Sequence, residues 1–210
     1  MTTVSADDAA YLRGRQLLLP VANVRARTLH SSFDDPRDGG GRLHLALDIL
    51  APRGTPVLAA DDGRVWTVRQ NALGGLTVYT VDPADRFVFY YAHLDRYQPG
   101  LVDGLPILKG DTLGYVGTTG NAPPNVPHLH FQAARIGPDH KWWTGAPFDP
   151  TPYLRDAEVA LAGREGTARA AADVARADSP RALVVPAIRT RRAPSVPADT
   201  AAPDSTRRRR

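Results

Sequence analysis

The 210-residue sequence contains no cysteine, which excludes disulfide bridges, thiolate metal ligands and a cysteine nucleophile. Any metal site must therefore use histidine, aspartate or glutamate, and only six histidines are available. No apolar run is long enough to cross a membrane, since the stretch at 17–21 is far shorter than the roughly 20 residues required. We therefore expect no transmembrane segment. The first residues also lack the basic and apolar regions of a signal peptide, so no export signal is visible in this sequence.

The positive charge of the chain is concentrated in its last part. The formal net charge is +4, but residues 161–210 hold 11 arginines against 5 acidic residues, so the remainder of the chain is slightly acidic. The basic tail lacks interleaved aromatic residues and a recognition-helix pattern, so we predict no specific binding of nucleic acid. Weak binding of anionic polymers is the interaction that its charge favours.

Composition divides the chain into four parts. The N-terminal extension, 1–30, predicts a short helix with Asp7 and Asp8 near its start and Pro20 beyond its end. The main domain is predicted at 31–154. Residues 155–178 are rich in alanine and favour a helix, whereas residues 179–210, rich in proline, alanine and arginine, predict a disordered tail.

The main domain has the pattern of antiparallel β structure. No long helical period appears between residues 42 and 136, and short runs rich in β-branched and aromatic residues are separated by turns. These runs lie at 42–47, 57–60, 65–68, 76–81, 87–93, 110–117 and 128–133. The fold class predicted from them is mostly β.

Four histidines fall at three places in this β region. His44 is followed four residues later by Asp48, His93 ends an aromatic run, and His128 and His130 form a pair. The two members of the pair point to the same face of a strand. In a straight strand, His44 and Asp48 would lie roughly 13 Å apart. If both bind one metal, the backbone must bend between them.

The number of these side chains matches the needs of a catalytic zinc site. Such a site has three protein ligands and one position for water. His44, Asp48 and one histidine of the pair His128 and His130 supply three ligands. His93 and the other member of the pair remain for proton transfer and for the developing oxyanion. A lone histidine on a strand is more often structural, but the complete set favours a metallohydrolase.

The motifs His-x-x-x-Asp, Tyr-Ala-His-Leu and Pro-His-Leu-His-Phe resemble those of the lysostaphin-like M23 metallopeptidases. Further matching segments extend the resemblance over about residues 31–135. It implies an antiparallel, open barrel-like sandwich of the lysostaphin type and a Zn²⁺ cofactor. It also implies roles for five residues. The expected zinc ligands are His44, Asp48 and His130, and the expected catalytic pair is His93 and His128.

The resemblance further implies a substrate and a location. The chain is expected to hydrolyse peptide bonds in the crosslinks or stem peptides of peptidoglycan, in the cell envelope or outside the cell. One alternative is a non-catalytic relative of the same fold that binds peptidoglycan or activates a partner hydrolase, although such a relative would be expected to lose one of the five residues. Another is a phage or secretion-associated lysin that uses the arginine-rich tail to reach the wall. Specificity is expected to depend on the loops 69–75, 98–105 and 121–127.

A few positions carry secondary expectations. Ala46 stands where the family usually has glycine, so its methyl group is expected to restrict the bend. Tyr91 is expected to share a strand face with His93 and to border the cleft. His30 and His140 match no motif and are predicted on the surface. The two tryptophans at 142–143 are predicted to form a hydrophobic lid, with a carbohydrate platform as the alternative.

Overall fold

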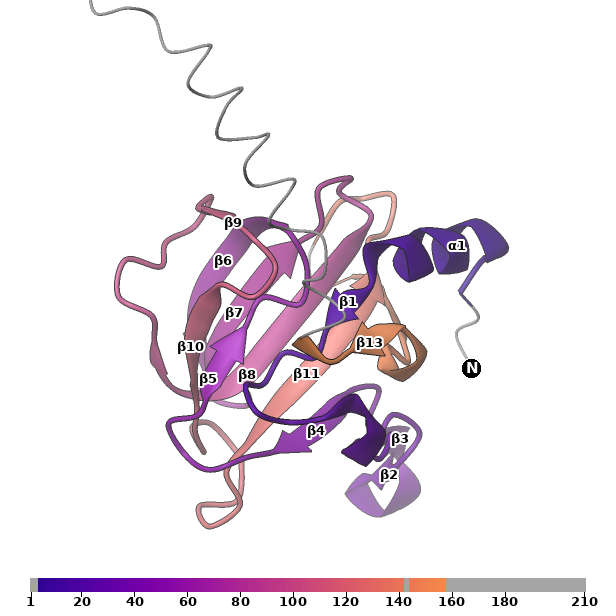
Figure 1. Ribbon diagram of the computed structural model, residues 1–210. Helices are drawn as coiled ribbons and strands as arrows, with labels where there is room; N and C mark the ends of the chain where they lie inside the picture. The colour runs from indigo at the N-terminus through magenta and orange to yellow at the C-terminus, as the bar shows by residue number, and fades with distance from the viewer. Residues whose placement is uncertain (1–3, 142–143, 158–210) are drawn as a thin grey trace, which may run out of the picture. The chain divides into compact units, whose positions relative to one another are not determined.

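The computed structural model describes residues 4–141 and 144–157 of the chain. The main feature of this part is an antiparallel sheet of nine strands, with α1 beside it (Figure 1). The helical elements are α1 (Ala6–Arg15), η1 (Ala26–Thr28), η2 (Asp38–Gly40) and η3 (Thr151–Tyr153). The strands are β1 (Leu17–Leu18), β2 (Pro36–Arg37), β3 (Arg42–Leu43), β4 (Leu47–Leu50), β5 (Pro56–Leu58), β6 (Gly63–Asn71), β7 (Gly75–Val81), β8 (Phe87–Tyr97), β9 (Pro106–Ile107), β10 (Thr112–Val116), β11 (His128–Arg135), β12 (Ala146–Phe148) and β13 (Leu154–Arg155).

This architecture confirms the predicted mostly β fold with a short N-terminal helix. The alanine-rich helix expected at 155–178 falls outside the described residues from 158 onward, and so does the tail expected at 179–210. The tryptophans at 142–143 also lie outside them.

Helix α1 begins where its sequence predicts and ends earlier than Pro20. The Ser5 side chain caps it by accepting a hydrogen bond from the Asp8 backbone N–H at 3.1 Å. The helix ends at Gln16, whose left-handed backbone (φ +49°) turns the chain into β1. Strand β1 then pairs in parallel with β13, which ties the N-terminal extension to the end of the main domain. The local backbone turn, and not proline, therefore terminates this helix.

The large sheet branches where the candidate residues lie. Its main path runs β12-β11-β8-β7-β6-β9, β4 adds to β11, and β10 pairs with both β8 and β5. Strand β11 thus lies against both β8 and β4. This branch brings β4, β8 and β11 side by side, although they are far apart in the sequence (Figure 1).

One predicted strand is interrupted. The alternation at 42–47 predicts a continuous strand, but β3 ends at Leu43 and β4 begins at Leu47. Between them Leu45 adopts a left-handed backbone with φ +57°, which residues other than glycine, asparagine and aspartate seldom occupy. The bend that the sequence demands therefore exists at Leu45. Ala46, where the restriction was expected, is not among the positive-φ residues and is fully buried.

The core explains why Tyr91 does not border the cleft. Opposite the single residue Thr77 of β7, strand β8 places two residues, Ala92 and His93, so the strand bulges there. The bulge breaks the alternation of faces. Tyr91 is fully buried, packs 5.3 Å (between ring centroids) from Phe131 and accepts a hydrogen bond from the Ala60 backbone N–H. The expectation for Tyr91 is wrong because it assumed an uninterrupted strand.

Candidate active site

Strand pairing places two of the expected ligands opposite each other. In the β4–β11 ladder His130 is the register partner of Asp48, and in the β8–β11 ladder it is the partner of Ala92. Directly paired residues have side chains about 5 Å apart at Cβ on the same face. The fold therefore brings Asp48 and His130 together without any contribution from loops.

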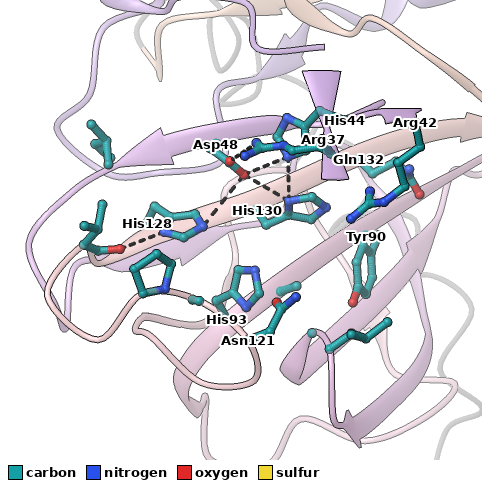
Figure 2. Close-up of a pocket in the computed structure, with 17 residues that line it drawn as sticks. Arg37, Arg42, His44, Asp48, Tyr90, His93, Asn121, His128, His130 and Gln132 are labelled. Carbon is teal, nitrogen blue, oxygen red and sulfur yellow. Dashed lines mark hydrogen bonds and ion pairs between the residues drawn. The ribbon is translucent and has the colours of Figure 1, made fainter. Parts of the chain in front are cut away.

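His44 reaches the same place from outside the ladder. Its backbone N–H donates to the Asp35 carbonyl at 2.9 Å, and the Leu45 N–H donates to the Phe33 carbonyl at 2.8 Å. Phe33 is buried and anchors this loop in the core. The loop and the left-handed residue at Leu45 together turn the His44 side chain toward Asp48 (Figure 2).

Three donor atoms surround one point. His44 Nε2 lies 3.1 Å from Asp48 Oδ1, His130 Nδ1 lies 3.0 Å from the same oxygen, and the two nitrogens are 3.1 Å apart. Two ligands bonded to zinc at about 2.0–2.1 Å in a tetrahedron are held about 3.4 Å apart. The triangle of His44, Asp48 and His130 is close to one face of such a tetrahedron. It is also the one group of potential metal ligands found among residues 4–141 and 144–157.

The hydrogen bonds of His44 add a second reason for a cation. Its Nδ1 lies 2.9 Å from the Ser32 carbonyl, and because a carbonyl only accepts, Nδ1 carries the proton. In the neutral ring Nε2 then presents a lone pair to the Asp48 carboxylate. This contact is repulsive unless a positive charge lies between the two atoms. Ser32 also accepts from the Asp48 N–H with its hydroxyl at 3.0 Å, so one serine orients two candidate ligands.

The electrostatics of the three side chains favour metal binding. Burial raises the pKa of Asp48, but the hydrogen bond and charge of His130 oppose this effect, and the pKa lies well below its usual value. Burial lowers the pKa of His130 and outweighs the opposing effect of Asp48. An ionised Asp48 beside a neutral His130 is the protonation state in which these two groups bind metal.

The expected catalytic pair faces the same point. His93 Nδ1 donates to the Thr119 carbonyl at 2.8 Å, and His128 Nδ1 donates to the Val126 carbonyl at 2.8 Å. Their ring centroids are 5.0 Å apart, and His128 Nε2 lies 3.8 Å from Asp48 Oδ1. Both rings therefore present an unprotonated Nε2 when neutral. Burial is the main cause that lowers the pKa of His93 to about 4, so His93 is neutral at pH 7.

His93 is held in a strained conformation. Its φ is +60°, and its N–H donates to the Gly74 carbonyl at 2.7 Å. Left-handed backbone at a residue of this kind costs free energy and is found where surrounding structure fixes it, often at functional sites. The bulge in β8 and the neighbouring loop hold His93 in that orientation.

The five residues line a groove of about 750 Å³. Its rim carries the exposed apolar side chains Leu50, Leu73 and Val126, and two arginines lie along it (Figure 2). Of the three loops expected to set specificity, 69–75 and 121–127 contribute to the lining, whereas 98–105 contributes nothing to it. The prediction for the loop 98–105 is therefore wrong, because that loop packs beside β6 and β9, away from the candidate ligands.

Several side chains in or next to the groove were not predicted from the sequence. No spacing rule connects Arg37 or Ser32 to Asp48, so neither was singled out from the sequence. Tyr90 lines the groove in the place expected for Tyr91, because the bulge in β8 breaks the alternation of strand faces between Tyr91 and His93. His30 and His140 are exposed and do not line the groove, as expected. Among the described residues no helix is long and apolar enough to span a membrane.

Comparison with known proteins identifies the family. Residues 42–150 match Peptidase family M23, and the chain belongs to this family. It is 33% identical to the L-Ala–D-Glu endopeptidase of Bacillus subtilis over 131 residues, which cover 60% of this chain and 39% of that protein. It is also 33% identical to the peptidoglycan DD-endopeptidase ShyC of Vibrio cholerae over 111 residues, covering 53% and 23% of the two chains.

Among solved structures, the chain is similar to a zinc containing peptidase from Vibrio cholerae. The TM-score is 0.50 at 25% identity, and the match covers 63% of this chain and 38% of the other. The chain thus spans less than two fifths of the length of each of these three proteins.

Proposed function

We propose that this chain is a zinc-dependent endopeptidase that hydrolyses peptide bonds in the crosslinks or stem peptides of peptidoglycan, with residues 31–154 as its peptidase domain. The observation that carries the proposal is the convergence of three donor atoms, from His44, Asp48 and His130, within 3.1 Å of one another. The names of the two similar endopeptidases, from Bacillus subtilis and Vibrio cholerae, support the reaction and the wall substrate. A substrate of this kind places the protein in the cell envelope or outside the cell.

The donor set fits zinc, and its ligands would be His44, Asp48 and His130. When bound there, zinc supplies a Lewis acid that lowers the pKa of water and polarises a carbonyl. The groove leaves room for an extended peptide beside these ligands, and its apolar rim suits small apolar side chains.

Proton transfer falls to His93 and His128. Because both Nδ1 atoms donate to backbone carbonyls, each ring takes up a proton only at Nε2 and delivers it from the same atom. These are the properties required of a group that accepts a proton from the attacking water and of one that donates to the oxyanion or the leaving amine. The lowered pKa keeps His93 unprotonated at neutral pH, so its Nε2 is available to accept the proton.

Two measurements test the proposal together. Zinc content of the purified protein is determined by elemental analysis, and clearing of purified peptidoglycan is followed by turbidity. We expect about one zinc per chain and clearing, both lost in His44→Ala and both kept in the control His140→Ala, which changes an exposed histidine. Absence of zinc from wild-type protein, even after zinc is offered, would overturn the site.

Zinc without clearing on several types of wall would instead support the alternative. In that case the chain would be a non-catalytic relative that binds peptidoglycan or activates a partner hydrolase. The presence of all five residues in one groove argues for the hydrolase. If the arginine-rich tail directs the enzyme to the wall, deletion after residue 180 abolishes binding to sacculi and leaves cleavage of a soluble peptide intact.

A further inference from the structure

The two oxygens of the Asp48 carboxylate have different partners. Oδ1 faces the histidines, at 3.1 Å from His44 Nε2 and 3.0 Å from His130 Nδ1. Oδ2 accepts a hydrogen bond from the Arg37 guanidinium at 2.6 Å. Figure 2 shows Arg37 reaching Asp48 on the side away from His128. One oxygen is thus presented to the candidate metal position while a cation holds the other.

Arg37 lies on a separate hairpin, which positions it beside Asp48. Strand β2 pairs with β3 through Pro36 opposite Leu43 and Arg37 opposite Arg42, and this two-stranded unit lies next to β4 (Figure 1). The hairpin directly precedes His44, so the segment that supplies one candidate ligand also supplies the residue that holds another.

One hydrogen-bond donor of the Arg37 guanidinium has no acceptor in the described part of the chain. Its Nε is buried and has no hydrogen-bond partner among the described residues. A buried N–H without an acceptor destabilises a fold, so a native structure that retains one has a compensating reason for the placement. Here the compensating contact is the short, charge-assisted bond to Asp48.

We propose that Arg37 is a positioning residue that fixes the rotation of the Asp48 carboxylate, so that Oδ1 alone is presented to zinc. The inference rests on the proposed zinc site. A free carboxylate rotates and offers either oxygen or both, and ordering it at the moment of binding reduces the affinity for the metal. A guanidinium already bonded to Oδ2 removes this freedom, as outer-shell partners of metal ligands do.

A different role for Arg37 makes a different prediction. Since Arg37 also lines the groove, a guanidinium that bound a carboxylate of the substrate would affect substrate binding and leave zinc affinity unchanged. In that case Arg37→Met raises KM and leaves the dissociation constant for zinc as it was. The positioning role requires instead that Arg37→Met raises the dissociation constant for zinc.

The experiment measures the zinc dissociation constant by chelator competition on metal-stripped protein, together with thermal unfolding of the metal-free form. Outer-shell substitutions of this type weaken metal affinity about 10- to 100-fold. We expect Arg37→Met to fall in that range and Arg37→Lys to lose less, because lysine keeps the charge but not the planar fork. In an Asp48→Ala background, Arg37→Met has no further effect on zinc binding.

A remote arginine provides the control. Arg64→Met removes an exposed pair with Asp85 that has the same 2.6 Å distance. This variant keeps zinc affinity within about twofold of wild type. If wild-type protein binds zinc and Arg37→Met binds it equally well, the positioning role is overturned and the proposed function stands. If wild-type protein binds no zinc, both fall.

Discussion

The Nε2 atom of His44 and the Oδ1 atom of Asp48 lie 3.1 Å apart, although four residues of straight strand would separate their backbones by roughly 13 Å. The left-handed backbone of Leu45 accounts for the difference, because it ends one strand and lets the chain re-enter the sheet as β4. The candidate metal site therefore depends on the conformation of a residue that does not contact it through its side chain.

This dependence makes Leu45→Val a sharp test. Valine is β-branched and tolerates positive φ poorly, so we expect a loss of about 1–2 kcal/mol of folding free energy and weaker zinc binding. The matched control is Leu43→Val, which removes the same methylene from an exposed strand position. Denaturant unfolding and chelator competition measure the two effects. If the two valine variants have equal stability and equal zinc affinity, the bend does not depend on the backbone preference of residue 45.

Substitution of His93 separates metal binding from proton transfer. His93 lies on β8, outside the group of three candidate ligands, so His93→Ala is expected to keep its zinc. General acid–base groups contribute about 10²- to 10⁴-fold to rate, and turnover of a soluble peptide is expected to fall by such a factor. Elemental analysis and a cleavage assay on the same preparation measure both quantities. Loss of zinc along with activity would instead make His93 part of the metal site.

The fold class was predictable from sequence because alternation and turn residues act locally. The runs at 65–68, 76–81 and 87–93 became β6, β7 and β8 with extended ends. The grouping of the five site residues was also predictable, since the motifs carry them. The contacts of the Arg37 guanidinium with Asp48 and of the Ser32 carbonyl with His44 were not, because they follow from how a hairpin and a loop lie in space.

Two of the errors, those on strand geometry, have one physical origin. Both the continuous strand at 42–47 and the position of Tyr91 were inferred from a strict period of two. At Leu45 and His93 the backbone adopts positive φ. The strict alternation of side chains between the two strand faces does not continue through such a residue. Neither position carries glycine, the usual signal for this conformation. The irregular residues lie beside the site, where local preference is overridden by the surrounding contacts.

Gly75 and Gly120 allow two groove loops to touch, and Gly75→Ala tests this contact. A Cβ at Gly75 would lie 2.2 Å from Thr119 Oγ1 and 2.5 Å from the Gly120 nitrogen, in a backbone with φ +66°. The control Gly54→Ala has φ +86° with nothing within 4 Å, so it isolates the backbone cost of about 1–2 kcal/mol. We expect Gly75→Ala to lose about 1–3 kcal/mol more, because overpacking forces the loops apart.

The same variant is expected to impair catalysis without releasing zinc. Thr119 supplies the carbonyl that orients His93, whereas the candidate ligands lie on or next to β4 and β11. Thermal unfolding, zinc content and peptide turnover are compared for the two alanine variants. If the stability and turnover of Gly75→Ala match those of Gly54→Ala, the loops have room to separate and do not constrain His93.

The N-terminal helix offers a test of stability that is independent of the site. The Tyr11 hydroxyl donates to Asp82 Oδ2 at 2.5 Å, and the fully buried Asp82 also accepts from the backbone N–H groups of Arg86 and Phe87. Burial and the hydrogen bond to Asp82 raise the pKa of Tyr11, so it remains a donor throughout the neutral range. A hydrogen bond to a charged group contributes about 1.5–3 kcal/mol, against about 0.5–1.5 kcal/mol for a neutral pair.

Tyr11→Phe is therefore expected to destabilise the protein by about 1 kcal/mol more than Tyr115→Phe, which removes a 2.9 Å bond from a hydroxyl to the neutral Gln98 side chain. Both changes delete one hydroxyl and nothing else, so denaturant midpoints compare the two bonds directly. Zinc content is expected to be unchanged in both. If Tyr11→Phe costs no more than Tyr115→Phe, α1 is held by its apolar contacts and by β1, and the backbone N–H groups of Ala84, Arg86 and Phe87 are sufficient partners for the buried Asp82.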